Sequence, residues 1–313
     1  MEIKDELYGE HEFPDYFLEI INTDTLQRLK GIHQNGADFL RDPRLSTTRF
    51  EHSIGVMMLT KILGGTIEAK LSALLHDVSH TVFSHTIDIV ENNGKQDYHE
   101  QIRQSFLEGS DLIEILKKHD VNLDYVLNEE NFGIVEQNIP DLCADRLDYF
   151  FRDLNRVELL TKEEITRTIK GLVVVEDNII CKDIETAEFL STKFLKMNLA
   201  IYFNPELEIV NIQLSSFIKK MLDSGIISRE DFLTVDEEII EKIRDSEFNE
   251  QFENILHTPV KIVESGDYFR KRKLRFVDPI VLTTNKRLSE DSQKFRDALS
   301  EFKKTPTIVY YDI

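Results

Sequence analysis

The pair His76-Asp77 places the strongest constraint on what this chain can fold into. An apolar run with helical spacing, 67–75, ends directly in the pair, and His80 and His85 follow within ten positions. An imidazole and a carboxylate side by side at a helix end offer one nitrogen and one oxygen ligand to a divalent metal ion. The sequence therefore predicts a helical scaffold that brings further ligands to this pair.

Helical patterns occupy most of the chain. With 7 proline and 12 glycine residues among 313, little material is left for tight turns. We expect two short helices within 15–33, the second capped near Thr23, and a loop or short hairpin over 34–48. The further helices that we expect span 49–63, 67–75, 84–93, 98–108, 111–119, 141–154, 184–203 and 206–223.

Strand patterns are few and mostly late in the chain. Two β-branched runs within 171–182 flank the turn sequence EDN and predict a β-hairpin. A basic, strand-like run at 269–276 and a second candidate strand at 307–311 follow acidic helical patterns. We expect a mainly α fold, with a helical domain over 1–225 and a smaller α+β lobe over 226–313.

Charge and cysteine content narrow the class of protein. The formal net charge is −20 and the pI is about 4.9, so the surface as a whole should repel nucleic acid and anionic lipid. The only cysteines, Cys143 and Cys181, argue against a disulfide framework or a cysteine-ligated zinc site. No signal-peptide core or run of roughly 20 apolar residues occurs. We expect a cytoplasmic protein without a membrane partner, and we do not expect nucleic acid as a partner.

Histidines cluster in one part of the chain. Five of the nine lie within fewer than fifty residues, and these are His52, His76, His80, His85 and His99. A single histidine is more often a packed or surface residue than a ligand. A cluster beside an adjacent aspartate instead indicates a metal or catalytic site.

The sequence around these histidines resembles the HD-domain phosphohydrolases. The matching segments read RFEHS at 49–53, HDVSH at 76–80, FSH at 83–85 and DRLDYF at 145–150. Within that family the sequence of these motifs is most similar to the deoxynucleoside triphosphate triphosphohydrolase branch, which includes the sterile-alpha-motif/HD-domain enzymes. The resemblance covers about residues 20–155, thins out to about 225, and implies a mainly helical HD-domain fold over 1–225.

The resemblance implies a metal site with the ligand order H…HD…D. Its four ligands here are His52, His76, Asp77 and Asp145. Two neutral imidazoles and two carboxylates suit a divalent transition metal such as Fe, Mn, Zn, Ni or Co, and the ligand types do not choose among these ions. Open positions on the ion would take water and a phosphate oxygen, and Mg could accompany the substrate phosphates.

The resemblance also implies residues that act on the phosphates. His99 would transfer the proton of the leaving oxygen, and Asp88 would orient it. His80, which we count as catalytic, and His85 would face the phosphates, while Arg49 would make a forked contact with phosphate oxygens. Alternatively, Asp88 is an exposed helix residue, and His80 and His85 orient ligands or bind a second metal.

A sugar pocket follows from the same resemblance. By helical spacing, Asp145, Tyr149 and either Arg152 or Asp153 share one face of the helix over 141–154. In the resembled branch a Tyr and an Asp at the positions of Tyr149 and Asp153 line the sugar pocket. The alternative is a packing aromatic and a surface carboxylate.

Two further residues join the predicted substrate site. Gln34, two positions before a glycine, also matches the resembled branch, and Arg146 follows the fourth metal ligand directly. We count both as substrate-binding residues.

The resemblance fails where a triphosphate needs cations. In the resembled branch these come from the long helix after the hairpin, but here Phe194, Asn198 and Pro205 stand at such positions. Other sources of positive charge are Arg146, Lys193, Lys196 and the run 270–275. We interpret that run first as an exposed edge strand, whose charges discourage sheet-to-sheet pairing, and second as an anion site.

These observations predict a metal-dependent phosphohydrolase acting on nucleotides, which cleaves a dNTP to a deoxynucleoside and triphosphate through a metal-activated water. One alternative is a phosphatase or phosphodiesterase acting on nucleoside monophosphates or cyclic nucleotides. Another is a nucleotide-sensing module without turnover. The resemblance alone implies a homo-oligomer.

Overall fold

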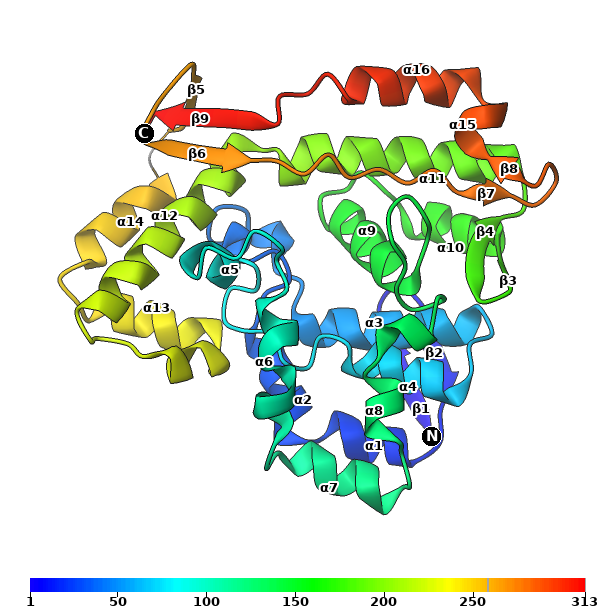
Figure 1. The fold of residues 1–313 in the computed structure, drawn as a ribbon, viewed down its shortest axis with the longest axis horizontal. Helices are drawn as coiled ribbons and strands as arrows, with labels where there is room; N and C mark the ends of the chain where they lie inside the picture. Colours follow the sequence, from blue (N-terminus) through cyan, green and yellow to red (C-terminus); the bar gives the residue numbers. More distant parts are fainter. Residues whose placement is uncertain (258, 313) are drawn as a thin grey trace.

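The computed structural model describes residues 1–257 and 259–312 and is mainly helical, as predicted, with three small sheets in this part (Figure 1). The helices before residue 170 are α1 (Tyr16–Ile21), α2 (Asp24–Gln27), α3 (Arg49–Ile62), α4 (Ile67–Leu75), α5 (Thr86–Val90), α6 (Tyr98–Leu107), α7 (Asp111–Lys118), α8 (Leu123–Val126), α9 (Ala144–Arg156) and α10 (Lys162–Lys170). The later helices are α11 (Ile184–Met197), α12 (Pro205–Asp223), α13 (Asp236–Arg244), α14 (Asn249–His257), α15 (Leu288–Asp291) and α16 (Gln293–Phe302).

The sheets are short and mostly antiparallel. β1 (Glu2–Asp5) pairs with β2 (Gly9–Glu12). The second sheet has the order β3-β4-β7-β8, with β3 (Leu172–Val175), β4 (Asn178–Cys181), β7 (Ile280–Val281) and β8 (Lys286–Arg287). The third has the order β5-β9-β6, with β5 (Lys261–Val263), β9 (Ile308–Asp312) and β6 (Tyr268–Lys271). The hairpin predicted over 171–182 is confirmed as β3 and β4.

The helices that carry the predicted ligands are placed by local sequence. Thr48 and Glu51 form a capping box, in which each side chain accepts from the other residue's backbone N–H, so α3 begins at residue 49 as predicted. At Gly55, α3 approaches α9 so closely that a Cβ atom would collide with the side chains of Asp148 and Arg152. Glycine therefore permits the close contact between the two helices.

Two predicted elements differ in detail. The segment 34–48 forms no hairpin but holds the 3-10 turns η2 (Asp38–Leu40) and η3 (Pro43–Leu45), with an isolated bridge between His33 and Thr48. The helix predicted over 184–203 ends as α11 at residue 197, and the π-helical turn η5 (Asn198–Tyr202) follows.

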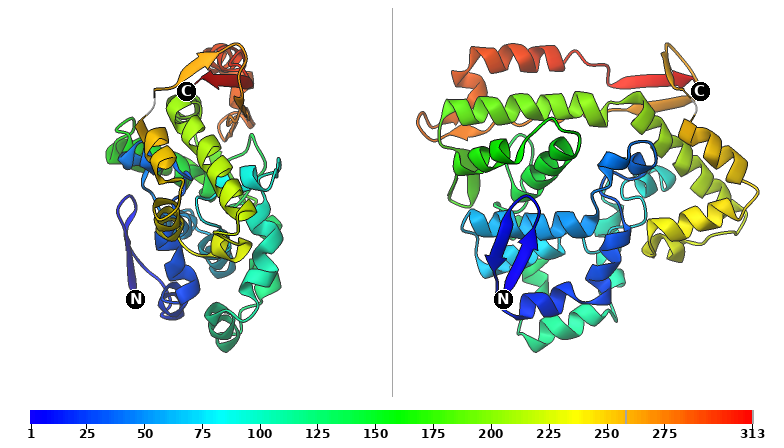
Figure 2. Two further views of the ribbon diagram at one scale, coloured as in Figure 1. Left: turned by 90° about the vertical axis from the view of Figure 1, so that its left-hand side faces the viewer. Right: turned by 180° about the vertical axis from the view of Figure 1, so that it is seen from behind.

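One hydrophobic core spans most of the molecule. Its C-terminal contributors are Val277, Val281, Leu288, Phe295, Leu299 and Phe302, which belong to the same buried cluster as the apolar residues of α3, α4 and α9. Both Figure 1 and Figure 2 show α16 lying along α11, and β7 joins β4 in parallel. The division near residue 225 stays a prediction, and the core is continuous across it.

The basic run forms a shorter strand than the 269–276 that the sequence predicts. β6 ends at Lys271, and the side chain of Arg272 turns inward to Glu208 of α12, with Nε 3.0 Å from both carboxylate oxygens. β6 is an edge strand of its sheet, which agrees with the first interpretation of its charges. Residues 272–279 then run as an irregular segment along α11 to β7 (Figure 1).

No helix within 1–257 or 259–312 combines the length and apolar character that a bilayer crossing requires.

Candidate metal centre and substrate pocket

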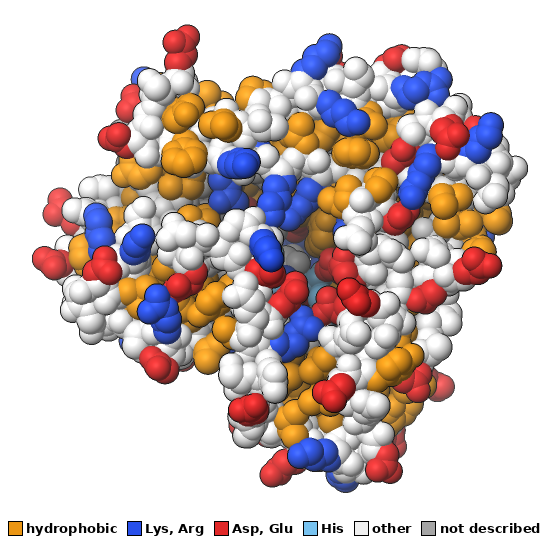
Figure 3. All heavy atoms as spheres, in the orientation of Figure 1, with side chains coloured by type: hydrophobic (Ala, Val, Ile, Leu, Met, Phe, Trp, Pro, Cys, Tyr) orange, Lys and Arg blue, Asp and Glu red, His pale blue; other side chains and the backbone are white. Residues whose placement is uncertain are grey.

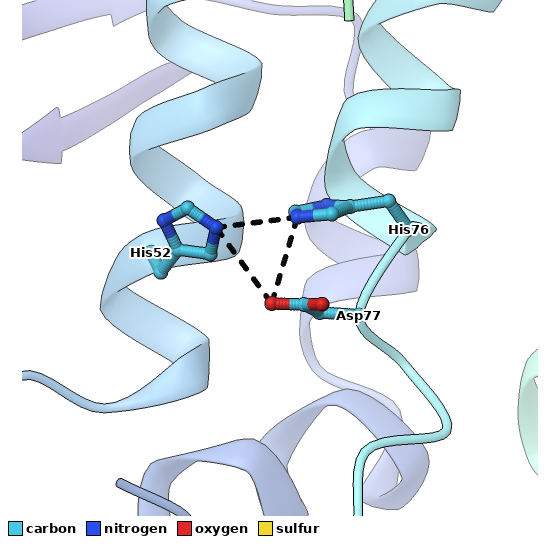
Figure 4. A group of neighbouring side chains, drawn as sticks. All are labelled: His52, His76 and Asp77. Carbon is cyan, nitrogen blue, oxygen red and sulfur yellow. Dashed lines mark hydrogen bonds and ion pairs between the residues drawn. The ribbon is translucent and has the colours of Figure 1, made fainter. Parts of the chain in front are cut away.

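The side chains of the four predicted metal ligands converge from three helices. His52 lies on α3, His76 caps the C-terminal end of α4 with Asp77 next to it, and Asp145 lies in the first turn of α9. The Nε2 atoms of the two histidines are 3.2 Å apart, and Asp145 Oδ1 lies 2.8 Å from that of His52. Asp77 Oδ2 is 3.7 Å from His52 Nε2 and 3.5 Å from His76 Nε2 (Figure 4).

The outer nitrogen of each imidazole is already committed. His52 Nδ1 contacts Asp148 Oδ2 at 2.7 Å, and His76 Nδ1 donates to the carbonyl of Ala73 at 2.8 Å. These bonds assign the tautomers in which both Nε2 lone pairs face the other ligands. The two Nε2 atoms converge with carboxylate oxygens of Asp77 and Asp145, and this set of nitrogen and oxygen donors suits a divalent ion.

The electrostatics of the cluster agree with a cation site. Burial lowers the pKa of His76, but the charge of Asp77 and the contact with Asp145 outweigh it and raise this pKa to about 10. Burial also lowers the pKa of His52, but hydrogen bonds to Asp145 and Asp148 outweigh this effect and raise it. A site that holds protons this strongly also attracts a metal ion, which binds in competition with them.

Arg49 is buried beside the cluster rather than in open solvent. Its Nη1 donates to Asp77 at 2.7 Å, Nε to the hydroxyl of Ser84 at 2.9 Å, and Nη2 to the carbonyl of Gln34 at 3.3 Å. Burial raises the pKa of Asp77, but Arg49 and then His76 outweigh this effect and hold the carboxylate ionised. The side-chain oxygen of Gln34 is buried and has no hydrogen-bond partner among the described residues, which leaves it available to a ligand.

The other three clustered histidines form a second group next to Asp77. The rings of His80 and His99 stack at 3.8 Å between centroids, and His85 meets them edge-on at 5.2 and 5.8 Å. His80 Nε2 lies 3.4 Å from Asp77 Oδ1. Burial lowers the pKa of His99 to about 3 and that of His80 well below its usual range, so both rings are neutral at pH 7.

The prediction that Asp88 orients His99 is wrong, because Asp88 contacts His85 instead. Asp88 Oδ2 contacts Nδ1 of His85 at 2.9 Å, and Oδ1 accepts from the backbone N–H of Tyr98 at 3.1 Å. Nδ1 of His99 is buried and has no hydrogen-bond partner in the described part of the chain. Asp88 lies one helical turn after His85 (i, i+3), which favours this pairing over one with His99. It is also buried, against the alternative of an exposed helix residue.

Polar side chains surround Asp153 near the C-terminal end of α9. Asn35 donates to Oδ1 and the hydroxyl of Tyr202 donates to Oδ2, both at 2.8 Å. The half-buried ring of Tyr149 lies 6.4 Å from that of Tyr202. Burial raises the pKa of Asp153 to about 6, although both hydrogen bonds oppose the change. Tyr202 thus links the predicted pair, because it lies beside Tyr149 and donates to Asp153, and Asp153 is buried rather than a surface carboxylate.

Among the described residues, the guanidinium of Arg146 forms no hydrogen bond with any of the four predicted metal ligands. Its Nη1 donates to the carbonyl of Asp141 at 2.7 Å, and Nη2 donates to the carbonyl of Gln137 at 2.9 Å. The guanidinium is therefore held by the loop that precedes α9. Its predicted contact with substrate stays a prediction.

Three residues of this site escape the sequence prediction. They are Asp148, Asn35 and Tyr202. Asp148 lies three positions after Asp145, and this i, i+3 spacing was the available signal for a second carboxylate facing His52. Asn35 and Tyr202 had no signal, because they meet Asp153 only through long-range packing.

The cluster opens to one face of the molecule. Figure 3 shows a hollow on this face with pale blue histidine atoms at its bottom, Asp and Glu side chains on both sides, and Lys and Arg side chains above and below it.

The chain is similar to known proteins over the site and over most of its length. The model for the family described as "HD domain" matches residues 49–153. The chain is 38% identical to "Uncharacterized protein YdhJ" of Bacillus subtilis, over 91% of this chain and 90% of that protein. It is 30% identical to "Metal-dependent phosphohydrolase cns2" of Cordyceps militaris, over 79% and 71%.

A more distant relative and a solved structure complete the comparison. The chain is 26% identical to "Deoxynucleoside triphosphate triphosphohydrolase SAMHD1 homolog" of Dictyostelium discoideum, over 93% of this chain and 62% of that protein. A phosphohydrolase structure from Bacteroides thetaiotaomicron matches with a TM-score of 0.71 at 18% identity, over 99% of this chain and 98% of that one. The shared fold therefore includes the C-terminal part of the chain.

Proposed function

Because this chain belongs to the HD-domain family of metal-dependent phosphohydrolases, we propose that it hydrolyses nucleotides and cleaves a dNTP to a deoxynucleoside and triphosphate. The observation that carries the proposal is the convergence of two imidazoles and two carboxylates beside a group of neutral histidines. When bound by His52, His76, Asp77 and Asp145, a divalent ion would polarise a phosphoryl oxygen and lower the pKa of water.

Arg49 would orient a phosphate next to the metal ligands. Three of its N–H groups are used by Asp77, Ser84 and Gln34, and a guanidinium carries five, so two remain for phosphate oxygens. Because Asp77 holds it in place, little side-chain entropy is lost on binding.

His99 would donate the proton that the leaving oxygen receives. With a pKa of about 3 it is neutral at pH 7, and its buried Nδ1 is without a partner among the described residues. An anionic substrate nearby would raise this pKa and allow the ring to carry the proton that the leaving oxygen receives. Stacking against His80 fixes the plane of the ring.

The choice of a deoxynucleotide rests on the residues around Asp153 and on the resemblance of Tyr149 and Asp153 to the sugar-lining residues of the deoxynucleoside triphosphate triphosphohydrolases. A carboxylate next to a tyrosine hydroxyl and an amide can recognise a sugar hydroxyl, and Tyr149 borders the same space. The name of the Dictyostelium relative supports the same substrate class.

A phosphatase or phosphodiesterase acting on monophosphates or cyclic nucleotides is the second candidate. It is favoured by the commitment of Arg146 to loop carbonyls and by the few cations on α11. The third candidate is a nucleotide sensor without turnover.

One panel of substrates separates the three. Purified protein is incubated with dNTPs, NTPs, deoxynucleoside monophosphates and cyclic nucleotides in the presence of Mn, Fe, Co or Mg, and the products are identified. Release of intact triphosphate supports the proposal, and orthophosphate from a monophosphate supports the second candidate. Stabilisation by nucleotide without turnover under any metal supports the sensor.

A further inference from the structure

The irregular segment 272–279 runs along α11 to β7. It is tied to the loop that leads into α6, because Lys273 Nζ donates to the carbonyl of Lys95 and Arg275 Nη2 to Oε1 of Gln96, each at 3.2 Å. This loop directly precedes His99 on α6. Lys273 and Arg275 therefore lie on the same side of the molecule as the proposed proton-transferring residue.

The two side chains lack carboxylate partners. Within the described residues, neither Lys273 nor Arg275 has a carboxylate oxygen within 4.0 Å, whereas Arg272 between them is paired with Glu208. In a chain with a net charge of −20, unpaired neighbouring cations are unusual. An anion bound beside the two side chains would relieve their mutual repulsion.

The nearby carboxylates are committed elsewhere. Asp88 and Asp97 are the carboxylates whose charges act on Lys273. Asp88 contacts His85 at 2.9 Å, and Asp97 accepts from Asn93 and Gln101, each at 2.8 Å. Both carboxylates are hydrogen-bonded to other side chains, and among the described residues neither forms an ion pair with Lys273.

The charge of Arg275 reaches both ends of the proposed substrate site. Burial is the main cause of the lowered pKa of His85, and Arg275 lowers it further. Burial raises the pKa of Tyr149 and of Tyr202, and in both cases Arg275 acts in the opposite direction. The positive charge of Arg275 therefore acts on the histidine group and on the two tyrosines near Asp153.

The other sources of positive charge are less suited to a phosphate chain. Arg146 is held by loop carbonyls, and Lys193 donates to the carbonyl of Leu159 at 2.6 Å. Lys196 is exposed on α11. The face shown in Figure 3 instead carries Lys and Arg side chains directly above the hollow.

We propose that Lys273 and Arg275 bind the phosphates of the substrate that extend beyond the metal ligands, so that this C-terminal segment selects a nucleoside triphosphate over a monophosphate. The inference rests on the proposed function in taking a nucleotide at the metal site. It replaces the cations that the long helix α11 does not supply, and it gives the basic run a role beyond protecting a sheet edge.

The test measures binding of inorganic triphosphate and of orthophosphate by calorimetry, with the full-length protein loaded with Mn²⁺. The double variant Lys273→Gln/Arg275→Gln is compared with Lys271→Gln/Lys286→Gln, which removes the same charge from exposed positions on either side of the segment. Loss of two charge-assisted contacts should weaken triphosphate binding by about 10–100-fold in the first variant. The control should bind as the wild type does, and orthophosphate affinity should change little in either.

Turnover measured on the same samples separates the two proposals. Weaker triphosphate binding in Lys273→Gln/Arg275→Gln supports the inference even if no nucleotide is hydrolysed, in which case only the proposed function fails. Hydrolysis of dNTP with equal triphosphate affinity in all three proteins overturns the inference and leaves the proposed function standing. A wild-type protein that does not bind triphosphate also overturns it.

Discussion

Asp148 contacts His52 on the side of the ring that faces away from the other predicted ligands, with its Oδ2 2.7 Å from Nδ1 of the imidazole. Asp145, three positions earlier on α9, approaches the other nitrogen of the same ring at 2.8 Å. One helix therefore supplies both a candidate ligand and the carboxylate that orients a second one. This relationship makes the tautomer of His52 a property of α9 packing rather than of the metal.

Replacement of Asp148 by Asn should weaken metal binding by about 10–100-fold, because the amide no longer fixes the imidazole with its Nε2 lone pair toward the ion. Competition with a chromophoric chelator measures the affinity. Asp5→Asn is the matched control, since Asp5 Oδ2 is buried and contacts the same Arg152 at 2.5 Å but does not touch His52. Equal metal affinity in both variants would count against the orienting role.

The sequence predicted the helices of the site well because their signals are local. Apolar spacing and the cap at Thr48 place α3 correctly, and the His-Asp pair ends α4 where expected. The hairpin over 171–182 also follows from its own residues. These elements need no knowledge of distant neighbours.

Side-chain partners were harder to predict, because they depend on how helices pack. Asp88 was expected to orient His99, but the short spacing to His85 decides its contact. Asn35 and Tyr202 are separated from Asp153 by 118 and 49 positions, so no local pattern could place them beside it. For the same reason, the sequence could not show that the basic run leaves the strand at Lys271 and continues as an irregular segment along α11.

Asp153 should make stability depend on pH. Burial raises its pKa to about 6 in the folded protein, whereas an unfolded aspartate titrates near its usual value of about 4. The folded state therefore binds the proton more tightly, and the resulting stability is present below about pH 4 and is lost as the pH rises through about 6.

The variant Asp153→Asn does not titrate and should escape this loss. Relative to wild type, its free energy of unfolding should rise by about 2–3 kcal/mol between about pH 4 and pH 7.5. Urea denaturation at several pH values measures the difference, with Asp124→Asn as a control at an exposed position. A constant difference across this range would contradict the raised pKa.

Arg49→Gln should destabilise the metal-free protein by about 3–5 kcal/mol, because Asp77 is left buried without its cation. A bound divalent ion supplies compensating charge, so the loss should shrink when Mn²⁺ is added. Urea denaturation with chelator and with Mn²⁺ measures both values. The control Arg44→Gln breaks an exposed pair with Asp42 and should cost at most about 1 kcal/mol in either condition.

The buried pair between Arg272 and Glu208 should fix the C-terminal strands to α12. Arg272 donates to both carboxylate oxygens of Glu208, and the hydroxyl of Tyr311 on β9 donates to the same carboxylate. Glu208→Gln leaves the guanidinium buried without a counter-charge, so unfolding free energy should fall by about 3–5 kcal/mol.

Replacing both partners by apolar residues, as Arg272→Met with Glu208→Leu, removes the buried charges together and should recover most of this loss. Lys271→Met, at the exposed neighbouring position, should change stability by less than about 0.5 kcal/mol. Urea denaturation compares the four proteins. If the double variant were no more stable than Glu208→Gln, packing around Arg272 rather than its charge would hold β6 and β9 in place.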